Sequence, residues 1–124
     1  RQSKTYIDVG DCARGILMAY DFYRGDLTGE LALSDSPHAE RFRVFNLSTQ
    51  GSTTVREIAE ETVRAVTGGK ARITYGRSPV GWVGDVPKTS LAVERMSALG
   101  WEPKADSTAA VFSAIRAHHE WSAL

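Results

Sequence analysis

The sequence of 124 residues lacks most of the features that assign a chain quickly to a class of protein. Its single cysteine, Cys12, cannot form an internal disulfide, so nothing indicates a secreted scaffold held by disulfides. Neither sign of charge is in excess, because 15 basic residues balance 15 acidic ones. This balance argues against a protein that coats nucleic acid and against a polybasic membrane-surface domain. The apolar runs are too short to span a bilayer and no signal-peptide pattern is seen, so we expect a cytoplasmic protein.

The familiar phosphate-binding and metal-binding motifs are also missing. The sequence has no GxGxxG or P-loop glycine pattern, no C-x-x-C pair and no H-E-x-x-H. His118 and His119 are adjacent on an expected helix, where neighbouring side chains point about 100° apart. We therefore expect one packed and one solvated histidine rather than a metal site. For Cys12, a buried structural cysteine is favoured over a reactive thiol.

What is present is the composition of an ordinary globular chain, with 42% hydrophobic and 24% charged residues. The length fits a single domain, residues 1–124, with a hydrophobic core of its own. β-Forming residues predict short strands at 5–9, 42–47 and 71–75. Helical spacing predicts four helices, at about 12–24, 55–66, 93–99 and 108–121. The fold class is therefore α/β, or α+β as an isolated piece, with about three short strands and four helices.

Capping residues mark the ends of these helices. Asp11 is a good N-cap for the first helix, and Ser107 is expected to cap the last. The spacing Thr54-x-x-Glu57 is that of a capping box. Glycines are expected to end the first three helices: Gly25, Gly68 and Gly100.

Apolar spacing also predicts which helix faces are buried. The expected inward residues of the first helix are Ala13, Ile16, Leu17 and Tyr20. Those of the short third helix are Val93, Met96 and Leu99. The last helix places Ala110, Val111, Ala114, Ile115 and His118 on one face. Trp101 and Trp121 are expected to fill core or interface volume.

The segment 76–87 carries the most suggestive chemistry. Its glycines and prolines prevent regular structure, and it contains Arg77, Trp82 and Asp85. Arginine suits phosphate oxygens, tryptophan offers a stacking face, and aspartate accepts hydrogen bonds from sugar or amide donors. Two interpretations stay open from spacing alone: a ligand-binding loop, or a connector whose Trp82 covers the core. Lys4, beside the first expected strand, has no meaning by itself.

The order of the segments resembles the extended short-chain dehydrogenase/reductases, the NAD-dependent nucleotide-sugar epimerases and dehydratases such as UDP-glucose 4-epimerase. The passages that carry the resemblance are K-T-Y-I-D-V-G-D at 4–11, F-N-L-S-T at 45–49 followed by T-V-R-E-I at 54–58, G-D-V-P at 84–87, L-G-W-E-P at 99–103, and the closing helix at 109–121. They are similar to the family's R-D-Y-I-H-V-x-D, F-N-L-G-T-G with S-V-x-E, R-x-G-D-x-P, L-G-W-x-P and final helix. No one passage is diagnostic, but the ordered set covers nearly the whole chain.

The resemblance implies that the chain is the substrate-binding, C-terminal portion of such an enzyme. The family's glycine-rich NAD loop and Tyr-x-x-x-Lys catalytic pair are not in the sequence. We therefore expect no catalytic residue, no cofactor-binding residue and no metal site in this chain. NAD is the cofactor of the full-length family, and this chain alone is expected to bind none and to catalyse nothing.

The resemblance also implies the substrate-binding residues. The family's strand arginine and the Arg and Asp of its R-x-G-D loop bind the nucleotide diphosphate and ribose, and they match Lys4, Trp82 and Asp85. Lys4 keeps the charge without the bidentate fork, Trp82 has no charge, and Arg77 is the candidate substitute. We expect a nucleotide-diphosphate sugar to bind weakly at Lys4, Arg77, Trp82 and Asp85.

Three hypotheses remain: the binding portion of an epimerase or dehydratase, a stand-alone oligomeric binding or interaction module without catalysis, and a structural remnant. In the family the strand at 42–47 pairs within a larger sheet. Bare strand edges invite pairing with another chain, so the resemblance also predicts a homo-oligomer. We expect neither nucleic acid nor a membrane as a partner.

Overall fold

The structure is a computed structural model that describes residues 2–25, 43–76 and 90–122. Two short strands, β1 (Ser3–Lys4) and β2 (Thr53–Thr54), pair antiparallel, with Ser3 opposite Thr54 and Lys4 opposite Thr53. The described residues also form four helices, α1 (Val9–Arg24), α2 (Val55–Thr67), α3 (Glu94–Ser97) and α4 (Ser107–Ser122). The expected mixture of helices and strands is confirmed in its α+β form.

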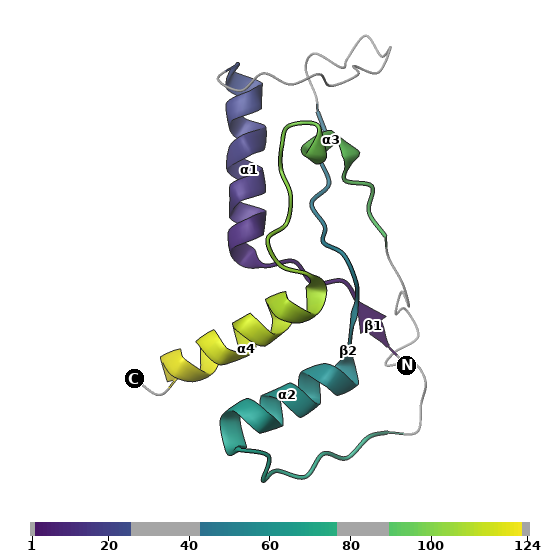
Figure 1. Ribbon diagram of the computed structural model, residues 1–124, viewed down its shortest axis with the longest axis vertical. Coiled ribbons are helices and arrows are strands. Elements are labelled where there is room, and N and C mark those ends of the chain that lie inside the picture. Colours follow the sequence, from purple (N-terminus) through teal and green to yellow (C-terminus); the bar gives the residue numbers. More distant parts are fainter. Residues whose placement is uncertain (1, 26–42, 77–89, 123–124) are drawn as a thin grey trace.

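The helices fall into two groups on either side of the strand pair (Figure 1). Helices α2 and α4 pack against each other, and β2 contacts both of them. Helix α1 stands along one edge of the molecule (Figure 1), and the short α3 lies beside the 43–49 segment, to which Arg95 is hydrogen-bonded. The segments 4–11, 45–49 and 99–105 connect the two groups.

Helix α1 begins one turn earlier than the sequence predicts. Asp8 is its N-cap, because its Oδ1 accepts hydrogen bonds from the backbone N–H groups of Gly10 (2.8 Å) and Asp11 (3.3 Å). The prediction of Asp11 as the cap was therefore wrong, because this residue lies inside the first turn and is buried. Gly25 ends the helix as expected, with the left-handed φ of 83°.

The face of α1 that the sequence predicts to be buried is exposed. Ala13, Ile16, Leu17 and Tyr20 all face solvent, whereas the inward residues include Met18 and Phe22. The inward face is the one that carries Gly15. A Cβ at this position would lie 3.0 Å from Trp101 Nε1 and closer still to the side chain of Leu47, so the lack of a side chain allows the close approach. Apolar residues occur on both faces of this helix, so periodicity alone could not tell which one packs inward.

Helix α2 agrees with its sequence signals. The capping box is complete, because Thr54 Oγ1 accepts from Glu57 N–H (3.1 Å) and Glu57 Oε2 accepts from Thr54 N–H (2.7 Å). Gly68 ends the helix with a φ of 62°. Glu61, buried between α2 and α4, pairs with Arg64 at 2.5 Å and with Arg116 at 3.6 Å. The pair with Arg116 joins α2 to α4, whereas the pair with Arg64 lies within α2.

The strand predictions were largely wrong. Residues 5–8 are irregular, and neither 43–47 nor 71–75 forms a strand. A strand needs a neighbouring strand to form hydrogen bonds with its backbone groups. At 43–47 one backbone carbonyl is bonded by a side chain instead, and a side chain of the segment bonds another part of the chain. Arg95 donates to the carbonyl of Val44 at 3.1 Å, and Asn46 Nδ2 donates to the carbonyl of Ala92 at 3.0 Å. The segment is thus held in place without the backbone hydrogen bonds of a β-sheet.

The start of α4 differs from expectation, although the helix itself is confirmed. Asp106 caps it, accepting from Ala109 N–H at 2.8 Å. Ser107, the predicted cap, is instead a buried junction: its hydroxyl lies 2.8 Å from Thr53 Oγ1 and accepts from Tyr6 N–H at 3.0 Å. The side chain of Ser107 therefore connects the N-terminal segment, β2 and α4.

The core lies between α1 and the segment after α3. Trp101 and Met96 are fully buried and Leu99 nearly so, as the sequence predicts for all three residues, while Val93, also expected to face inward, is half-buried. Partly buried residues from three other segments pack on this cluster: Ile7, Met18, Ala19, Phe22, Phe45 and Leu47. Gly100 has a φ of 84°, but its prediction as the end of the third helix was wrong, because α3 has Ala98 as its C-cap, two residues earlier. Trp121, in contrast, is 74% exposed and fills no core volume.

Candidate functional site

Three of the passages that carry the sequence resemblance meet in the core. Ile7 comes from the first passage, Leu47 from the second, and Leu99 and Trp101 from the fourth, and all belong to one packed cluster. The passage at 84–87 lies outside the described residues. Segments far apart in the sequence are therefore neighbours in the fold, and the surface between them is the candidate site.

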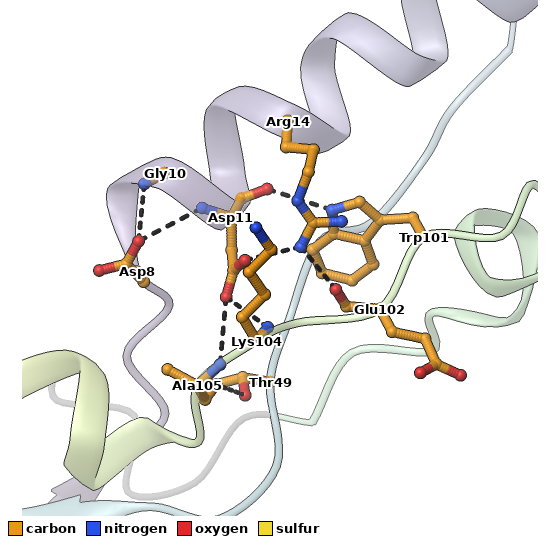
Figure 2. A network of polar contacts seen from close by, with 9 residues as sticks. All are labelled: Asp8, Gly10, Asp11, Arg14, Thr49, Trp101, Glu102, Lys104 and Ala105. Carbon is orange, nitrogen blue, oxygen red and sulfur yellow. Dashed lines mark hydrogen bonds and ion pairs between the residues drawn. The ribbon is translucent and has the colours of Figure 1, made fainter.

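The carboxylate of Asp11, at the start of α1, binds the backbone of the loop that borders this surface (Figure 2). Its Oδ2 accepts hydrogen bonds from the backbone N–H groups of Lys104 (2.8 Å) and Ala105 (3.3 Å), and its Oδ1 accepts from Arg14 at 2.7 Å. Burial alone would raise the pKa of Asp11, but the hydrogen bonds from Arg14, Lys104 and Ala105 outweigh it and lower the pKa. The carboxylate is therefore ionised at neutral pH.

Three further contacts hold the same loop against α1, and Figure 2 shows the residues that make them. Trp101 Nε1 donates to the backbone carbonyl of Asp11 at 3.1 Å. Arg14 donates a second hydrogen bond, to the carbonyl of Glu102 at 2.6 Å, and its guanidinium lies over the Trp101 ring. The segment 101–105 thus has a fixed position relative to α1.

A polar hollow of about 780 Å³ opens beside this fixed loop. Its walls come from Thr5 and from residues in 48–51, 90–97 and 102–106. The walls are tied together by side chains: Thr5 Oγ1 donates to the carbonyl of Gly51 at 2.9 Å, and Thr49 Oγ1 to that of Ala105 at 2.5 Å. Besides hydroxyl and backbone groups, its lining carries one basic residue, Lys104, and two acidic residues, Glu102 and Asp106.

A second, smaller hollow of about 180 Å³ adjoins the first. The two share Thr5, Ser48 and Leu91 in their walls, and Lys4 lines the smaller one. Lys4 lies in β1 and is exposed. The smaller hollow is thus lined by a lysine, and an ammonium group is a good partner for anionic oxygens such as those of phosphate, whereas the larger hollow also carries two carboxylates.

Of the four residues predicted to bind substrate, the structure places one at this site. Lys4 lines the smaller hollow, whereas Arg77, Trp82 and Asp85 lie outside the described residues. The described chain resumes at Ser90, and both Ser90 and Leu91 line the larger hollow.

Sequence reasoning missed two features of the site. Lys104 is an isolated base in the sequence, and only the Asp11 contacts bring its backbone beside the first and second passages. Asp11 itself was interpreted as a helix cap, and nothing local in the sequence indicates its bonds to residues more than 90 positions away. Both are products of tertiary packing and leave no local signal.

An apolar hollow of about 590 Å³ lies on another face, between α2 and α4. Tyr6, Val66 and Ile115 contribute to its lining, and His118 and His119 stand at its wall. Both histidines are exposed, so the expectation that one is packed was wrong. Within residues 2–25, 43–76 and 90–122 there is no group of three or more side chains suited to hold a metal ion. Cys12, expected to be buried, is half-buried.

Comparison with known proteins leaves the chain without relatives to guide the assignment. No family model matches it, and no curated protein sequence matches it significantly. In the part of the chain that the structure describes, no helix has the length and apolar content required to cross a membrane. The site must therefore be interpreted from its own residues and from the sequence resemblance.

Proposed function

We propose that this chain is the nucleotide-sugar-binding portion of an NAD-dependent epimerase or dehydratase of the extended short-chain dehydrogenase/reductase type, without catalytic competence of its own. Two kinds of observation support the proposal. The resembling passages occur in family order along the sequence. Three of them also pack into one core beside a pair of adjoining hollows with both polar and apolar lining.

The observation that carries the proposal is the position of Lys4. This residue matches the family's strand arginine, and in the fold it lines a hollow together with Ser48 of the second passage. A residue chosen by sequence resemblance thus lies where a phosphate group could reach it. In the proposed complex Lys4 and Arg77 bind diphosphate oxygens, Trp82 stacks on a planar group, and Asp85 accepts hydrogen bonds from ribose hydroxyls.

Isothermal titration calorimetry with UDP and with dTDP tests this function. We expect weak binding of at least one nucleotide and no binding of NAD, because the sequence has no glycine-rich dinucleotide loop. Asp85→Ala and Lys4→Ala should each weaken binding about tenfold or more, the effect of losing one charge-assisted hydrogen bond. Lys70→Ala is the matched control, since Lys70 is an exposed lysine after α2 that lines neither polar hollow.

The result that overturns the proposal is equally specific. If neither nucleotide produces heat, or if Lys70→Ala weakens binding as much as Lys4→Ala, the chain has no nucleotide site at these residues. A second candidate function, that of an oligomeric module without catalysis, is favoured by the exposed apolar face of α1.

A further inference from the structure

In the part of the chain that the structure describes, helix α1 exposes an apolar stripe along its whole length. The outer stripe, as we call it, consists of Val9, Ala13, Ile16, Tyr20 and Tyr23. Successive members are separated by four, three, four and three residues, which is the spacing of the seam along which two helices pack. The large members are well exposed: Val9 83%, Ile16 60%, Tyr20 54% and Tyr23 74%.

This stripe is additional to the face on which α1 already packs. The inner face carries Gly15, Met18 and Phe22, which contact the core or lie close against it. A helix that is apolar on both faces is typical of one buried on both sides. Tyrosine adds to the indication, because it supplies a large contact area at small entropic cost and is enriched at protein interfaces.

We propose that the outer stripe binds the outer stripe of a second copy of this chain, with the two α1 helices antiparallel. The stripe is complementary to itself in size. Its N-terminal half carries the small side chains of Val9 and Ala13, and its C-terminal half carries Tyr20 and Tyr23. An antiparallel pair related by a twofold axis near Ile16 sets each small residue opposite a large one. A parallel pair would set tyrosine against tyrosine and leave a gap between the small residues.

The ends of α1 are complementary in charge in the same arrangement. Asp8 caps the N-terminal end and Arg24 occupies the last turn. An antiparallel pair brings Asp8 of one copy beside Arg24 of the other, and it also aligns the opposite ends of the two helix dipoles. The chain has no net charge, so long-range repulsion between copies is small.

The size of the contact sets the expected affinity. A helix of 16 residues is about 24 Å long, at about 1.5 Å per residue. A contact between two such helices buries an area at the low end of specific interfaces, which run from about 1,200 Å² upward. We therefore expect a reversible dimer with a dissociation constant in the micromolar range. This dimer does not depend on the nucleotide site, which lies among other segments of the chain.

Sedimentation velocity across a range from about 1 to 500 μM chain tests the inference directly. The wild-type chain should pass from monomer to dimer. Tyr20→Glu places a charge in the seam and should weaken dimerisation at least tenfold. Trp121→Glu is the matched control, because Trp121 is a similarly exposed aromatic residue on α4, and this variant should dimerise as the wild type does. A wild-type chain that stays monomeric throughout, or two variants of equal effect, would refute the pairing.

Disulfide trapping tests the geometry without requiring a monomeric variant. In a Cys12→Ser background, Ile16→Cys places one thiol near the proposed axis in each copy, within reach of a disulfide. Mild oxidation with diamide should cross-link this variant into a dimer. Val9→Cys should cross-link much less, because an antiparallel pair sets Val9 opposite Tyr23, whereas a parallel pair would set Val9 opposite itself. Equal cross-linking at both positions would contradict the antiparallel pairing, and failure of nucleotide binding would leave both results unchanged.

Discussion

Asp11 is the buried carboxylate on which the polar surface of the candidate site depends. Its side chain accepts from Arg14, Lys104 N–H and Ala105 N–H, so no simple substitution preserves all of these contacts. Removing one partner of a buried hydrogen bond leaves the others unsatisfied, and this costs more than the bond itself contributed. The consequences should be visible in both the stability of the chain and its dependence on pH.

Asp11→Asn should lower the free energy of unfolding by about 1–3 kcal/mol, measured by urea denaturation at pH 7. The pKa of Asp11 is lowered from its ordinary value of 3.8, so near that pH the unfolded chain holds this proton more tightly than the folded one. The stabilisation is therefore complete above pH 3.8 and is lost as the pH falls through the lowered value. As the pH is lowered below 3.8, the free energy of unfolding should therefore fall less in the variant than in the wild type.

Asp21→Asn is the control for this measurement, since Asp21 is exposed on the same helix. It should change stability by less than about 0.5 kcal/mol. An Asp11→Asn variant as stable as the wild type at pH 7 would show that the network contributes nothing net.

Gly15 is the residue that allows α1 to approach the core. A methyl group there would contact Leu47 and would lie 3.0 Å from Trp101 Nε1. Gly15→Ala should therefore destabilise the chain by about 1–3 kcal/mol, although alanine is the better helix former by about 1 kcal/mol. Gly76→Ala is the control, because a Cβ at Gly76 meets open space. Chemical denaturation of both variants measures the difference, and a stabilised Gly15→Ala would contradict the close approach.

At the scale of elements, the capping box of α2 gives a test of local signals. Thr54 Oγ1 accepts from Glu57 N–H, a bond that alanine cannot make. Thr54→Ala should cost about 1 kcal/mol of stability, and Thr54→Ser should restore most of it because serine caps equally well. Thermal unfolding followed by far-ultraviolet circular dichroism measures both variants. Equal losses in the two variants would mean that the methyl group of Thr54, and not its hydroxyl, is responsible.

The elements also show how far the sequence could predict this fold. Capping and glycine signals are local, and so the four helices and the ends at Gly25 and Gly68 were predictable. Strands depend on partners distant in the sequence, and the expected ones at 43–47 and 71–75 do not form. The inward face of α1 depends on the Gly15 contact with Trp101, which no periodicity reveals.

The candidate site was predictable to a smaller degree. Resemblance identified Lys4, and the fold places it at a hollow. Lys104 reaches the adjoining hollow only because Asp11 binds the backbone around it. Such a contact between distant residues arises from packing, so a motif search along the chain could not find it.

At the scale of the whole molecule, the described residues form only a small apolar core. Its buried hydrophobic residues are Met96, Leu99, Trp101 and Ala110. Several apolar residues of α1, in contrast, are exposed. Burying little apolar surface leaves little free energy to oppose chain entropy, so the single chain should be only marginally stable.

Marginal stability and the proposed α1 pairing together predict a melting temperature that depends on concentration. A dimer forms only from folded chains, so raising the chain concentration above the dissociation constant favours the folded state by mass action. For 124 residues this should raise the melting temperature by about 2–3 °C per tenfold increase in concentration. Differential scanning calorimetry at several concentrations measures the slope. Tyr20→Glu should abolish the slope and Trp121→Glu should keep it, because only Tyr20 belongs to the outer stripe. A wild-type melting temperature that does not change with concentration would mean that the fold is stable without a second copy.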